Sequence, residues 1–404
     1  MKIAVVSKAD RHGGGASSVA ESKVRFLRNT GIYAEHFVSW HGPENSDRVR
    51  LLYGDYGKLV RKLQKRMERV GLPDLIPFEY YLSGKRLREF DVVHFHDLSS
   101  AVSPFTLKWL SREMPVVWTF HDCSPFTGGC LYPMECKGYL KACADRCPQI
   151  GRWPLGKNYD FTSRYTAIKQ KLFQSERLCP IVPSQWMSDM AVSSGLLPAA
   201  PKVIPNYVDT KVFYPRDTKA TKRQYGLPLD RAIILLSAGN ILDRRKGTLD
   251  AIQALRTIER DAYHLLLVGN YSPEAERELE GMGHTFTGYL GDKEALAEVY
   301  SVADLFLFPT KADNMPLVVL ETMACGTPVI TYDIGGLPEM VVDSQSGRSV
   351  PVGDVAAMST VLAETLEKRS FVEWSTECVR RANKLYSVAR FTDAHIELYK
   401  SLLK

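Results

Sequence analysis

The sequence contains no long hydrophobic run. Although 45% of its 404 residues are hydrophobic, it has no stretch of about 18 consecutive apolar residues, so we expect no transmembrane helix. The first apolar stretch, within MKIAVVSKADRHGGG, is only four residues long and no small-residue cleavage site follows it, which argues against a signal peptide. The length instead predicts two or three packed domains.

Cysteines are scarce outside one segment. Five of the eight lie within residues 123–147, and Cys179, Cys325 and Cys378 stand alone. A disulfide-rich secreted scaffold would spread its cysteines through the chain, so this pattern favours a reducing, cytoplasmic compartment.

Charge is distributed unevenly. Residues 1–205 contain 29 Lys and Arg against 19 Asp and Glu, whereas the remainder contains 23 against 27. The positive first half indicates that this part of the chain meets an anionic surface or substrate.

Short apolar runs alternate with amphipathic helices along the chain. KIAVVSK, DVVHFHD, AIILLSAG and PVITYD are examples of such runs. The alternation predicts an α/β fold with parallel sheets covered on both faces. It restarts at residue 232, after the irregular stretch KVIPNYVDTKVFYP, so we expect two Rossmann-like domains. We place them at 1–205, with a Cys-rich insertion at 123–150, and at 206–385. A C-terminal helix within 386–404 is expected to return to the first domain.

The stretch ADNMPLVVLETMACGTPVI, residues 312–330, carries two acids within an apolar setting. It predicts a helix from about Pro316, capped by Asn314, directly after the strand LFLFPT. The free N–H groups of such a helix end suit a phosphate. Asp313 precedes the helix, and Glu321 lies inside it, where an unpaired carboxylate is costly and a pair of ribose hydroxyls would satisfy it. The residues alone leave an alternative, in which Asp313 caps the helix and Glu321 pairs with an arginine.

D-N-M-P-L-V-V-L-E followed by A-C-G-T-P-V-I resembles the acid-x7-acid signature of retaining glycosyltransferases of the GT-B fold, family 4. The resemblance implies two Rossmann-like domains facing across a cleft, with Asp313 on hydroxyls of the donor sugar and Glu321 on the nucleotide ribose. The first acid of the family is usually Glu, so Asp313 is one methylene shorter. The resemblance also implies backbone contacts with sugar and phosphate from Asn314, Met315, Pro316 and Leu317.

The loop SAGNILDRRKG, residues 237–247, follows a predicted strand and contains Arg244, Arg245 and Lys246. These cations suit a diphosphate, although a solvated turn is the alternative. The resembled family has G-R-x5-K-G here, with Arg and Lys on the donor phosphates. Lys246 matches the lysine, Asn240 stands where the arginine is expected, and Arg245 or Arg244 would supply the missing charge.

The chain contains no Asp-x-Asp triplet. Metal-dependent sugar transferases of the other common fold need this triplet to hold a cation on the diphosphate. We therefore expect protein cations and helix dipoles to replace the metal, so that no cofactor is required for catalysis.

The first predicted strand is followed by the glycine-rich stretch RHGGGASS. Gly14 and Gly15 allow the backbone to approach an anion closely. The stretch is not the dinucleotide-binding fingerprint, because Ser18 replaces the third glycine. It resembles the family's first loop, which approaches the donor diphosphate and the acceptor.

Three histidines lie in or after predicted strands. His94 and His96 should share one strand face and are expected to be structural. His121 ends the run PVVWTFH and matches the family position of a histidine near the reacting sugar. The resemblance implies that His121 orients a sugar hydroxyl or the acceptor.

The Cys-rich insertion places four thiols within eighteen residues, at Cys130, Cys136, Cys143 and Cys147. Four thiolates suit a tetrahedral structural zinc ion, while two disulfides or free thiols are the alternatives. The segment resembles an F-T-G-G-C-x-Y…C…C-P-Q insertion of transferases that build bacterial surface polysaccharides, and it would border the acceptor side.

Residues 56–70 predict a basic amphipathic helix, with Tyr56, Leu59, Val60, Leu63, Met67 and Val70 on one face. It is either an ordinary surface helix or one that lies on an anionic membrane.

These patterns predict a retaining, metal-independent hexosyltransferase. It would move a sugar from a UDP- or GDP-sugar to a hydroxyl of a lipid-linked saccharide in the synthesis of a bacterial lipopolysaccharide or exopolysaccharide. We expect a cytoplasmic protein, or one bound peripherally to the cytoplasmic face of the inner membrane, with no nucleic-acid partner. The alternatives are a sugar-nucleotide epimerase of the same fold and a non-catalytic membrane-surface binding protein.

Overall fold

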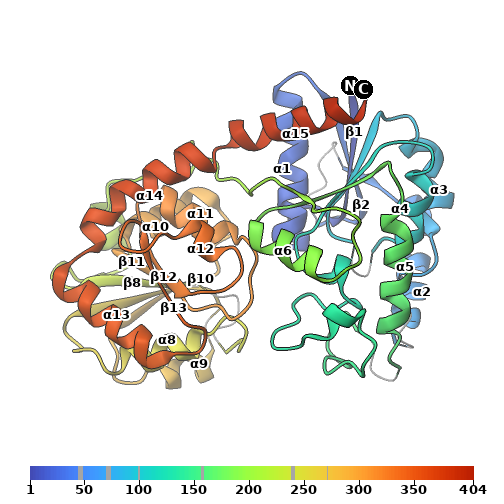
Figure 1. Ribbon diagram of the computed structural model, residues 1–404. Helices are drawn as coiled ribbons and strands as arrows, with labels where there is room; N and C mark the ends of the chain where they lie inside the picture. The colour runs from blue at the N-terminus through green and yellow to red at the C-terminus, as the bar shows by residue number, and fades with distance from the viewer. Residues whose placement is uncertain (44–48, 70–73, 99–100, 156–158, 238–241, 271) are drawn as a thin grey trace. The chain divides into compact units, whose positions relative to one another are not determined.

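The computed structural model describes residues 1–43, 49–69, 74–98, 101–155, 159–237, 242–270 and 272–404. They form two compact units. Unit 1 comprises residues 1–205 together with 391–404, and unit 2 comprises residues 206–390. Each unit has a parallel sheet flanked by helices (Figure 1). Within the described ranges, no helix is long and apolar enough to cross a membrane.

Unit 1 is built on a sheet with the strand order β3-β2-β1-β4-β5-β6-β7, in which all neighbours are parallel. Its strands are β1 (Lys2–Ala9), β2 (Tyr33–Trp40), β3 (Val49–Leu51), β4 (Val92–Phe95), β5 (Val116–Thr119), β6 (Leu178–Val182) and β7 (Lys202–Val203). Its α-helices are α1 (Gly15–Asn29), α2 (Gly57–Arg69), α3 (Phe78–Leu87), α4 (Pro104–Leu110), α5 (Thr162–Phe173) and α6 (Gln185–Ser193).

Residues along the strands of unit 1 alternate between two buried faces, as the period of two in a β-strand requires. Val93 and Phe95 of β4 join an apolar core with residues of α2 to α6. His94, between them in the sequence, faces the other side, where its ring contacts His395 and Tyr399 near the end of the chain. Both faces are covered, which explains why these strands are almost uniformly buried.

Unit 2 is built on a sheet with the order β10-β9-β8-β11-β12-β13, again with all neighbours parallel. Its strands are β8 (Ala232–Ser237), β9 (Tyr263–Val268), β10 (His284–Gly288), β11 (Leu305–Phe308), β12 (Val329–Tyr332) and β13 (Gly347–Val350). Its helices are α7 (Lys219–Gln224), α8 (Thr248–Leu255), α9 (Pro273–Glu278), α10 (Lys293–Val302), α11 (Leu317–Ala324), α12 (Leu337–Met340), α13 (Val355–Lys368) and α14 (Phe371–Leu385).

Two apolar clusters cover the two faces of the unit 2 sheet. One packs strand residues against α10, α11 and α14. The other packs alternate strand residues against α8, α9 and α13. The strands β8 and β11 are parallel neighbours at the centre of this sheet, so the loops that follow them start from the same edge.

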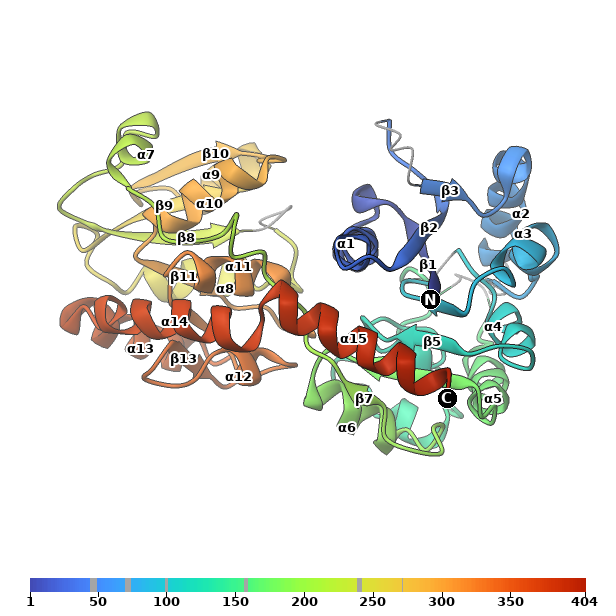
Figure 2. The same ribbon diagram turned by 90° about the horizontal axis from the view of Figure 1, so that it is seen from above.

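The last helix, α15 (Val388–Leu402), belongs to both units. Its first residues lie in unit 2, whereas residues 391–404 belong to unit 1 (Figures 1 and 2). The ring of Phe391 packs edge-on against Phe26 of α1, with 6.5 Å between centroids. The chain therefore passes between the units twice, once near residue 205 and once near residue 390.

Candidate active site

The site in unit 2 is built where the loops after β8 and β11 meet. The amide of Lys311 donates to the carbonyl oxygen of Arg245 at 2.8 Å. Gly247 has a φ of +66°, and a Cβ there would lie 1.9 Å from the carbonyl oxygen of Pro309. Only glycine permits both this backbone angle and this approach, so Gly247 locks the basic loop against the loop that carries Asp313.

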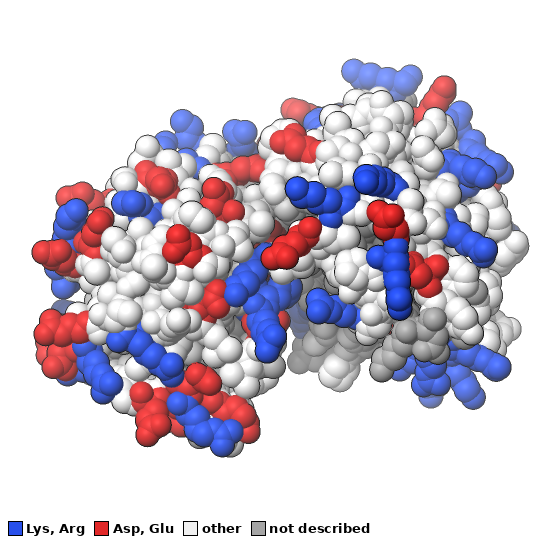
Figure 3. All heavy atoms as spheres, turned by 60° about the horizontal axis from the view of Figure 1, so that its bottom comes forward, with Lys and Arg blue, Asp and Glu red and all other residues white. Residues whose placement is uncertain are grey.

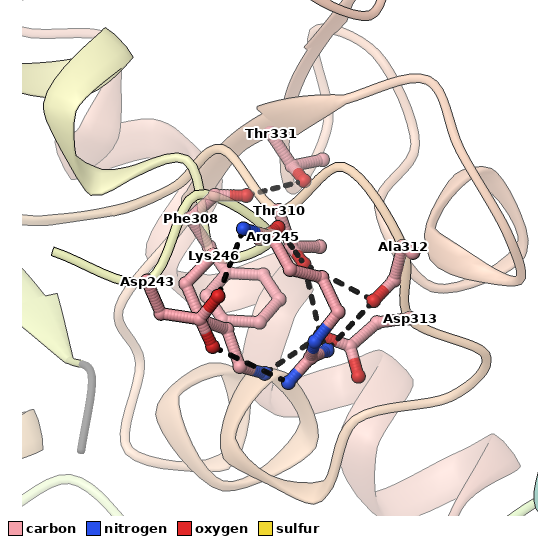
Figure 4. Close-up of polar contacts among 8 residues, drawn as sticks. All are labelled: Asp243, Arg245, Lys246, Phe308, Thr310, Ala312, Asp313 and Thr331. Carbon is pink, nitrogen blue, oxygen red and sulfur yellow. Dashed lines mark hydrogen bonds and ion pairs between the residues drawn. The ribbon is translucent and has the colours of Figure 1, made fainter. Parts of the chain in front are cut away.

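The Asp313 carboxylate is anchored through one of its two oxygens (Figure 4). Oδ2 lies 2.8 Å from Lys246 Nζ, 3.0 Å from Thr310 Oγ1 and 3.5 Å from Arg245 Nη1. Oδ1 receives no hydrogen bond from any residue that the structure describes. The Asp313 side chain is 14% exposed, so it is held rigidly while one oxygen stays available to a ligand.

A third loop supports Asp313 from behind. The amide of Gly336 donates to the carbonyl oxygen of Asn314 at 2.7 Å. Gly335 has a φ of +64°, and a Cβ at this position would lie 1.8 Å from the carbonyl oxygen of Asp313. The loop after β12 thus fits against the backbone of the acidic residue, and Gly335 is required for that fit.

The helix α11 starts one residue later than the sequence predicts. Pro316 is its N-cap residue, with extended backbone at φ −68° and ψ 129°, and Leu317 is the first helical residue. The predicted cap by Asn314 is therefore wrong, because the N-cap position lies two residues further on. Asn314 is buried, and Met315 is held by Asn206, whose Nδ2 donates to its carbonyl oxygen at 2.8 Å.

Glu321 lies on α11, as expected, and has no protein partner among the described residues. No hydrogen bond from them reaches its carboxylate, so the alternative of an ion pair with an arginine is not seen there. Burial raises its pKa to about 7, with Lys293 acting weakly in the opposite direction. A buried carboxylate without a protein partner is stabilised in its ionised form by a ligand that donates hydrogen bonds to it.

Other predicted site residues belong to unit 1. Gly14 has a φ of +102° and is the N-cap of α1, and Gly15 is the first residue of that helix. His121 follows β5. The structure thus brings Arg245, Lys246 and Asp313 together at the start of α11, while Gly14, Gly15 and His121 lie in the other unit. Asn240 lies outside the described residues.

His121 is neutral and joined to a second histidine. Its Nε2 lies 2.8 Å from His96 Nδ1, and the two rings stack with 5.1 Å between centroids. Burial, with Lys23 nearby, lowers the pKa of His121 to about 3. His94 and His96 share one face of the sheet, as predicted, and their rings stack at 4.5 Å.

The structure does not support the predicted zinc site. All eight cysteines are free thiols, and in the described ranges no three His, Cys, Asp or Glu side chains are arranged to hold a metal ion. Two of the thiols accept hydrogen bonds from the backbone. The N–H of Gly128 donates to Cys143 Sγ and the N–H of Gly138 donates to Cys136 Sγ, both at 3.3 Å.

Thr310, Gly335 and Asn206 were not predicted as parts of the site. Thr310 stands at the end of the run LFLFPT, three residues before Asp313, and a hydroxyl so placed could have been noticed as a partner. Asn206 is 109 residues from Met315, and no local pattern connects them.

Two parallel-sheet units, with a basic loop and an acidic helix start at the strand ends of one of them, define the GT-B class of α/β proteins. Two family models match the chain, "Glycosyltransferase Family 4" over residues 13–212 and "Glycosyl transferases group 1" over residues 232–368. The chain belongs to family 4 of the GT-B glycosyltransferases.

Individual proteins resemble the whole length of the chain. WcaC of Escherichia coli, assigned to colanic acid biosynthesis as a glycosyl transferase, is 24% identical over 96% of this chain and 97% of its own. Among solved structures, sucrose-phosphate synthase of Thermosynechococcus elongatus has a TM-score of 0.73 at 21% identity, covering 99% of this chain and 98% of its own. Anabaena HepE, solved with UDP-glucose, has a TM-score of 0.68 at 17% identity, covering 99% and 100%.

Proposed function

We propose that the protein transfers a hexosyl group from a UDP- or GDP-sugar to a hydroxyl of a saccharide acceptor, with retention at the anomeric carbon. The observation that carries this proposal is the anchoring of Asp313. Three donors fix Oδ2, and Oδ1 is left for the hydroxyls of the donor sugar.

The donor would lie along the loops of unit 2. Lys246 and Arg245 face the diphosphate, the backbone N–H groups at the start of α11 approach the phosphate and sugar, and Glu321 accepts hydrogen bonds from the ribose. The solved structure of HepE supports this class of donor, because HepE shares the fold and was solved with UDP-glucose bound.

The chemical step proceeds on one face of the sugar. The bond between the anomeric carbon and the β-phosphate oxygen breaks, and the acceptor oxygen forms its bond on the same face. The proton of the acceptor hydroxyl passes to the departing phosphate oxygen. Lys246 and Arg245 stabilise the negative charge that develops on that phosphate, so no metal ion is required.

The acceptor class is a saccharide of a bacterial surface polysaccharide, attached to a lipid. The likeness to WcaC supports the polysaccharide. A pocket in unit 1 supports the lipid, because its lining includes apolar side chains from the segment after β4, from β5 and from residues 150–155. These are Leu98, Val102, Trp118, Ile150 and Leu155. His121 would orient the sugar or the acceptor hydroxyl.

The exposed side of α2 supports a location at a membrane surface. Only Val60 and Gln64 of this helix are buried. Leu59 and Leu63 face solvent, at 56% and 38% exposure, and the basic residues Lys62, Lys65 and Arg66 lie beside them. The buried side of the helix therefore differs from the predicted apolar face, because it includes the polar Gln64 and leaves Leu59 and Leu63 exposed. Val70 lies outside the described residues. Lys and Arg predominate on unit 1 in the face that Figure 3 shows, whereas unit 2 carries both signs.

A transfer assay tests the proposal. The protein would be incubated with UDP- and GDP-sugars, with and without a lipid-linked saccharide, and products followed by NMR of the anomeric protons. A glycosyltransferase consumes the donor only when an acceptor is present and forms a linkage of unchanged anomeric configuration. Conversion of the nucleotide sugar without an acceptor would identify an epimerase instead, and absence of donor binding would leave the non-catalytic alternative.

A further inference from the structure

A lysine is buried among histidines in unit 1. Lys23 of α1 is 1% exposed, and its Nζ lies 2.9 Å from His395 Nε2 and 3.0 Å from His96 Nε2. No carboxylate of the described residues lies within ion-pair distance of it. Burial lowers the pKa of Lys23 well below its usual range. A buried amine in such surroundings acts through hydrogen bonds rather than through an ion pair.

The hydrogen bond between Lys23 and His395 has a fixed direction. His395 Nδ1 lies 2.7 Å from the carbonyl oxygen of Phe391, and a carbonyl oxygen can only accept. The proton of His395 is therefore on Nδ1. Burial lowers the pKa of His395 well below its usual value, so the ring is neutral and its Nε2 is an acceptor. Lys23 must donate to it.

His94 lies on a separate branch of this cluster. Its Nδ1 and Nε2 have close partners in Tyr399 Oη at 2.6 Å and Thr119 Oγ1 at 2.7 Å. Lys23 Nζ is almost equally far from both nitrogens, at 3.3 and 3.4 Å, so it faces the ring rather than either lone pair. Lys23 has at least two N–H donors whether its amine is charged or neutral, so after His395 the second is assigned to Nε2 of His96, its other short-range partner.

His96 passes the direction of this hydrogen bond to His121. A neutral imidazole has one donor and one acceptor nitrogen. If Lys23 donates to Nε2 of His96, the proton of His96 is on Nδ1, which lies 2.8 Å from His121 Nε2. The Nε2 of His121 then accepts, and the proton of His121 is on Nδ1.

We propose that Lys23 is a positioning residue that, through His96, fixes His121 as the Nδ1–H tautomer. The inference rests on the proposed function in assigning His121 to the reacting sugar or acceptor. It adds a chemical restriction to that role. With its proton on Nδ1 and its Nε2 engaged by His96, His121 is a hydrogen-bond donor at Nδ1 and does not serve as the base that removes a proton from the acceptor.

The tautomers can be measured without any substrate. In protein labelled with ¹⁵N-histidine, two-bond nitrogen–proton correlations distinguish protonated from unprotonated ring nitrogens, and the chain has nine histidines to assign. We expect His395, His96 and His121 all to carry the proton on Nδ1 at pH 7. A proton on Nε2 of His121 in the wild-type protein would overturn the proposal, whatever the outcome of the transfer assay.

A pair of variants separates positioning from simple packing. Lys23→Met removes the donor with little change in length, and Tyr399→Phe removes a hydroxyl from the branch through His94 only. Lys23→Met should change the tautomer populations of His96 and His121 and lower kcat at least about tenfold with little change in donor KM. Tyr399→Phe should leave His121 and kcat unchanged within about twofold. Unchanged His121 spectra in folded Lys23→Met would refute the proposal. If Lys23→Met does not fold, the wild-type spectrum alone decides.

Discussion

Lys246 Nζ and Asp313 Oδ2 lie 2.8 Å apart, on loops that follow neighbouring strands of the unit 2 sheet. The pair joins a cation suited to phosphate with an acid suited to sugar hydroxyls. Thr310 and Arg245 also contact the same carboxylate oxygen, so Asp313 would keep two partners if Lys246 turned toward a phosphate. In the proposed mechanism, the pair serves both ends of the sugar–phosphate bond.

Replacement of Lys246 by methionine should lower kcat/KM about 10²–10³-fold, because one cation that stabilises the departing phosphate is lost. Lys311→Met is a matched control, since Lys311 lies in the loop after β11 and pairs with Asp250 of α8 at 2.8 Å but has no place in the proposed site. Steady-state kinetics with the cognate donor checks both. Both ion pairs are partly exposed, so each variant should lose no more than about 1 kcal/mol of stability. Equal activity in the two variants would count against the site.

Gly335→Ala should disrupt the site through the backbone. The new Cβ would collide with the carbonyl oxygen of Asp313, in addition to the strain of a positive φ. Gly353→Ala is the control, because Gly353 has a φ of +78° but nothing within 4 Å of a Cβ. The control should cost about 1–2 kcal/mol of stability and keep its activity. Gly335→Ala should lose more stability and most of its transfer activity, measured by thermal unfolding and initial rates.

Glu321→Gln should make stability less dependent on pH. The folded-state pKa of about 7 lies above the ordinary value of 4.5, so the folded protein binds this proton more tightly than the unfolded chain. Stability therefore falls as pH rises from about 4.5 to about 7 and is level above. Glutamine does not ionise, so the Tm of the variant minus the Tm of wild type should increase by a few degrees between pH 5 and pH 8.

Thermal unfolding at a series of pH values measures this difference. Glu373→Gln is the control at an exposed position of α14 and should track wild type at every pH. A gap between Glu321→Gln and wild type that does not widen with pH would mean that the carboxyl is ionised without penalty in the folded protein.

Chelation of metal ions should leave transfer intact. If Arg245 and Lys246 neutralise the leaving diphosphate, EDTA should change the initial rate by less than about twofold, and added Mg²⁺ should not restore or raise it. A loss of activity in EDTA that Mg²⁺ reverses would show that the diphosphate needs a cation from solution.

The exposed face of α2 should bind anionic membranes. Sedimentation with vesicles containing phosphatidylglycerol should recover the protein at low salt and release it at high salt. The triple change of Lys62, Lys65 and Arg66 to Glu should weaken binding by at least about a hundredfold, because each basic residue near the surface contributes about 1 kcal/mol. The same change of three basic residues in unit 2, Lys222, Arg223 and Lys384, is the control and should have no effect.

Sequence patterns predict best those strands and helices whose formation is determined by the residues within them. The runs at β1, β8, β9 and β11 are continuous and apolar because both faces of each sheet are covered. The strands β10 and β13 lack such a local cause, because HTFTG and GRSV are short and mixed in polarity, and their pairing with β9 and β12 supplies the stability. Likewise, the periodicity of α2 could not show that Gln64 would be buried by its hydrogen bonds to Tyr53 and Ala101.

The site divides in the same way. Asp313, Glu321 and Lys246 stand out because each is an acid or a cation in a recognisable local setting. The contact of Gly335 with the backbone of Asp313 depends on the third dimension, and so does the cluster around Lys23. From the pattern of α1 alone, Lys23 would be predicted as a surface residue. Its burial depends on His395, which lies 372 positions away in the sequence.

That separation has a consequence for biosynthesis. Residues 391–404 belong to unit 1, yet in the chain they follow the whole of unit 2. Domains generally fold as units while the nascent chain emerges, but here the first half must wait, with Lys23 and the back of its sheet uncovered, until unit 2 and residues 391–404 have been made. We therefore expect emergence of residues 391–404, rather than emergence of residue 205, to be the event that makes the N-terminal half resistant to proteolysis.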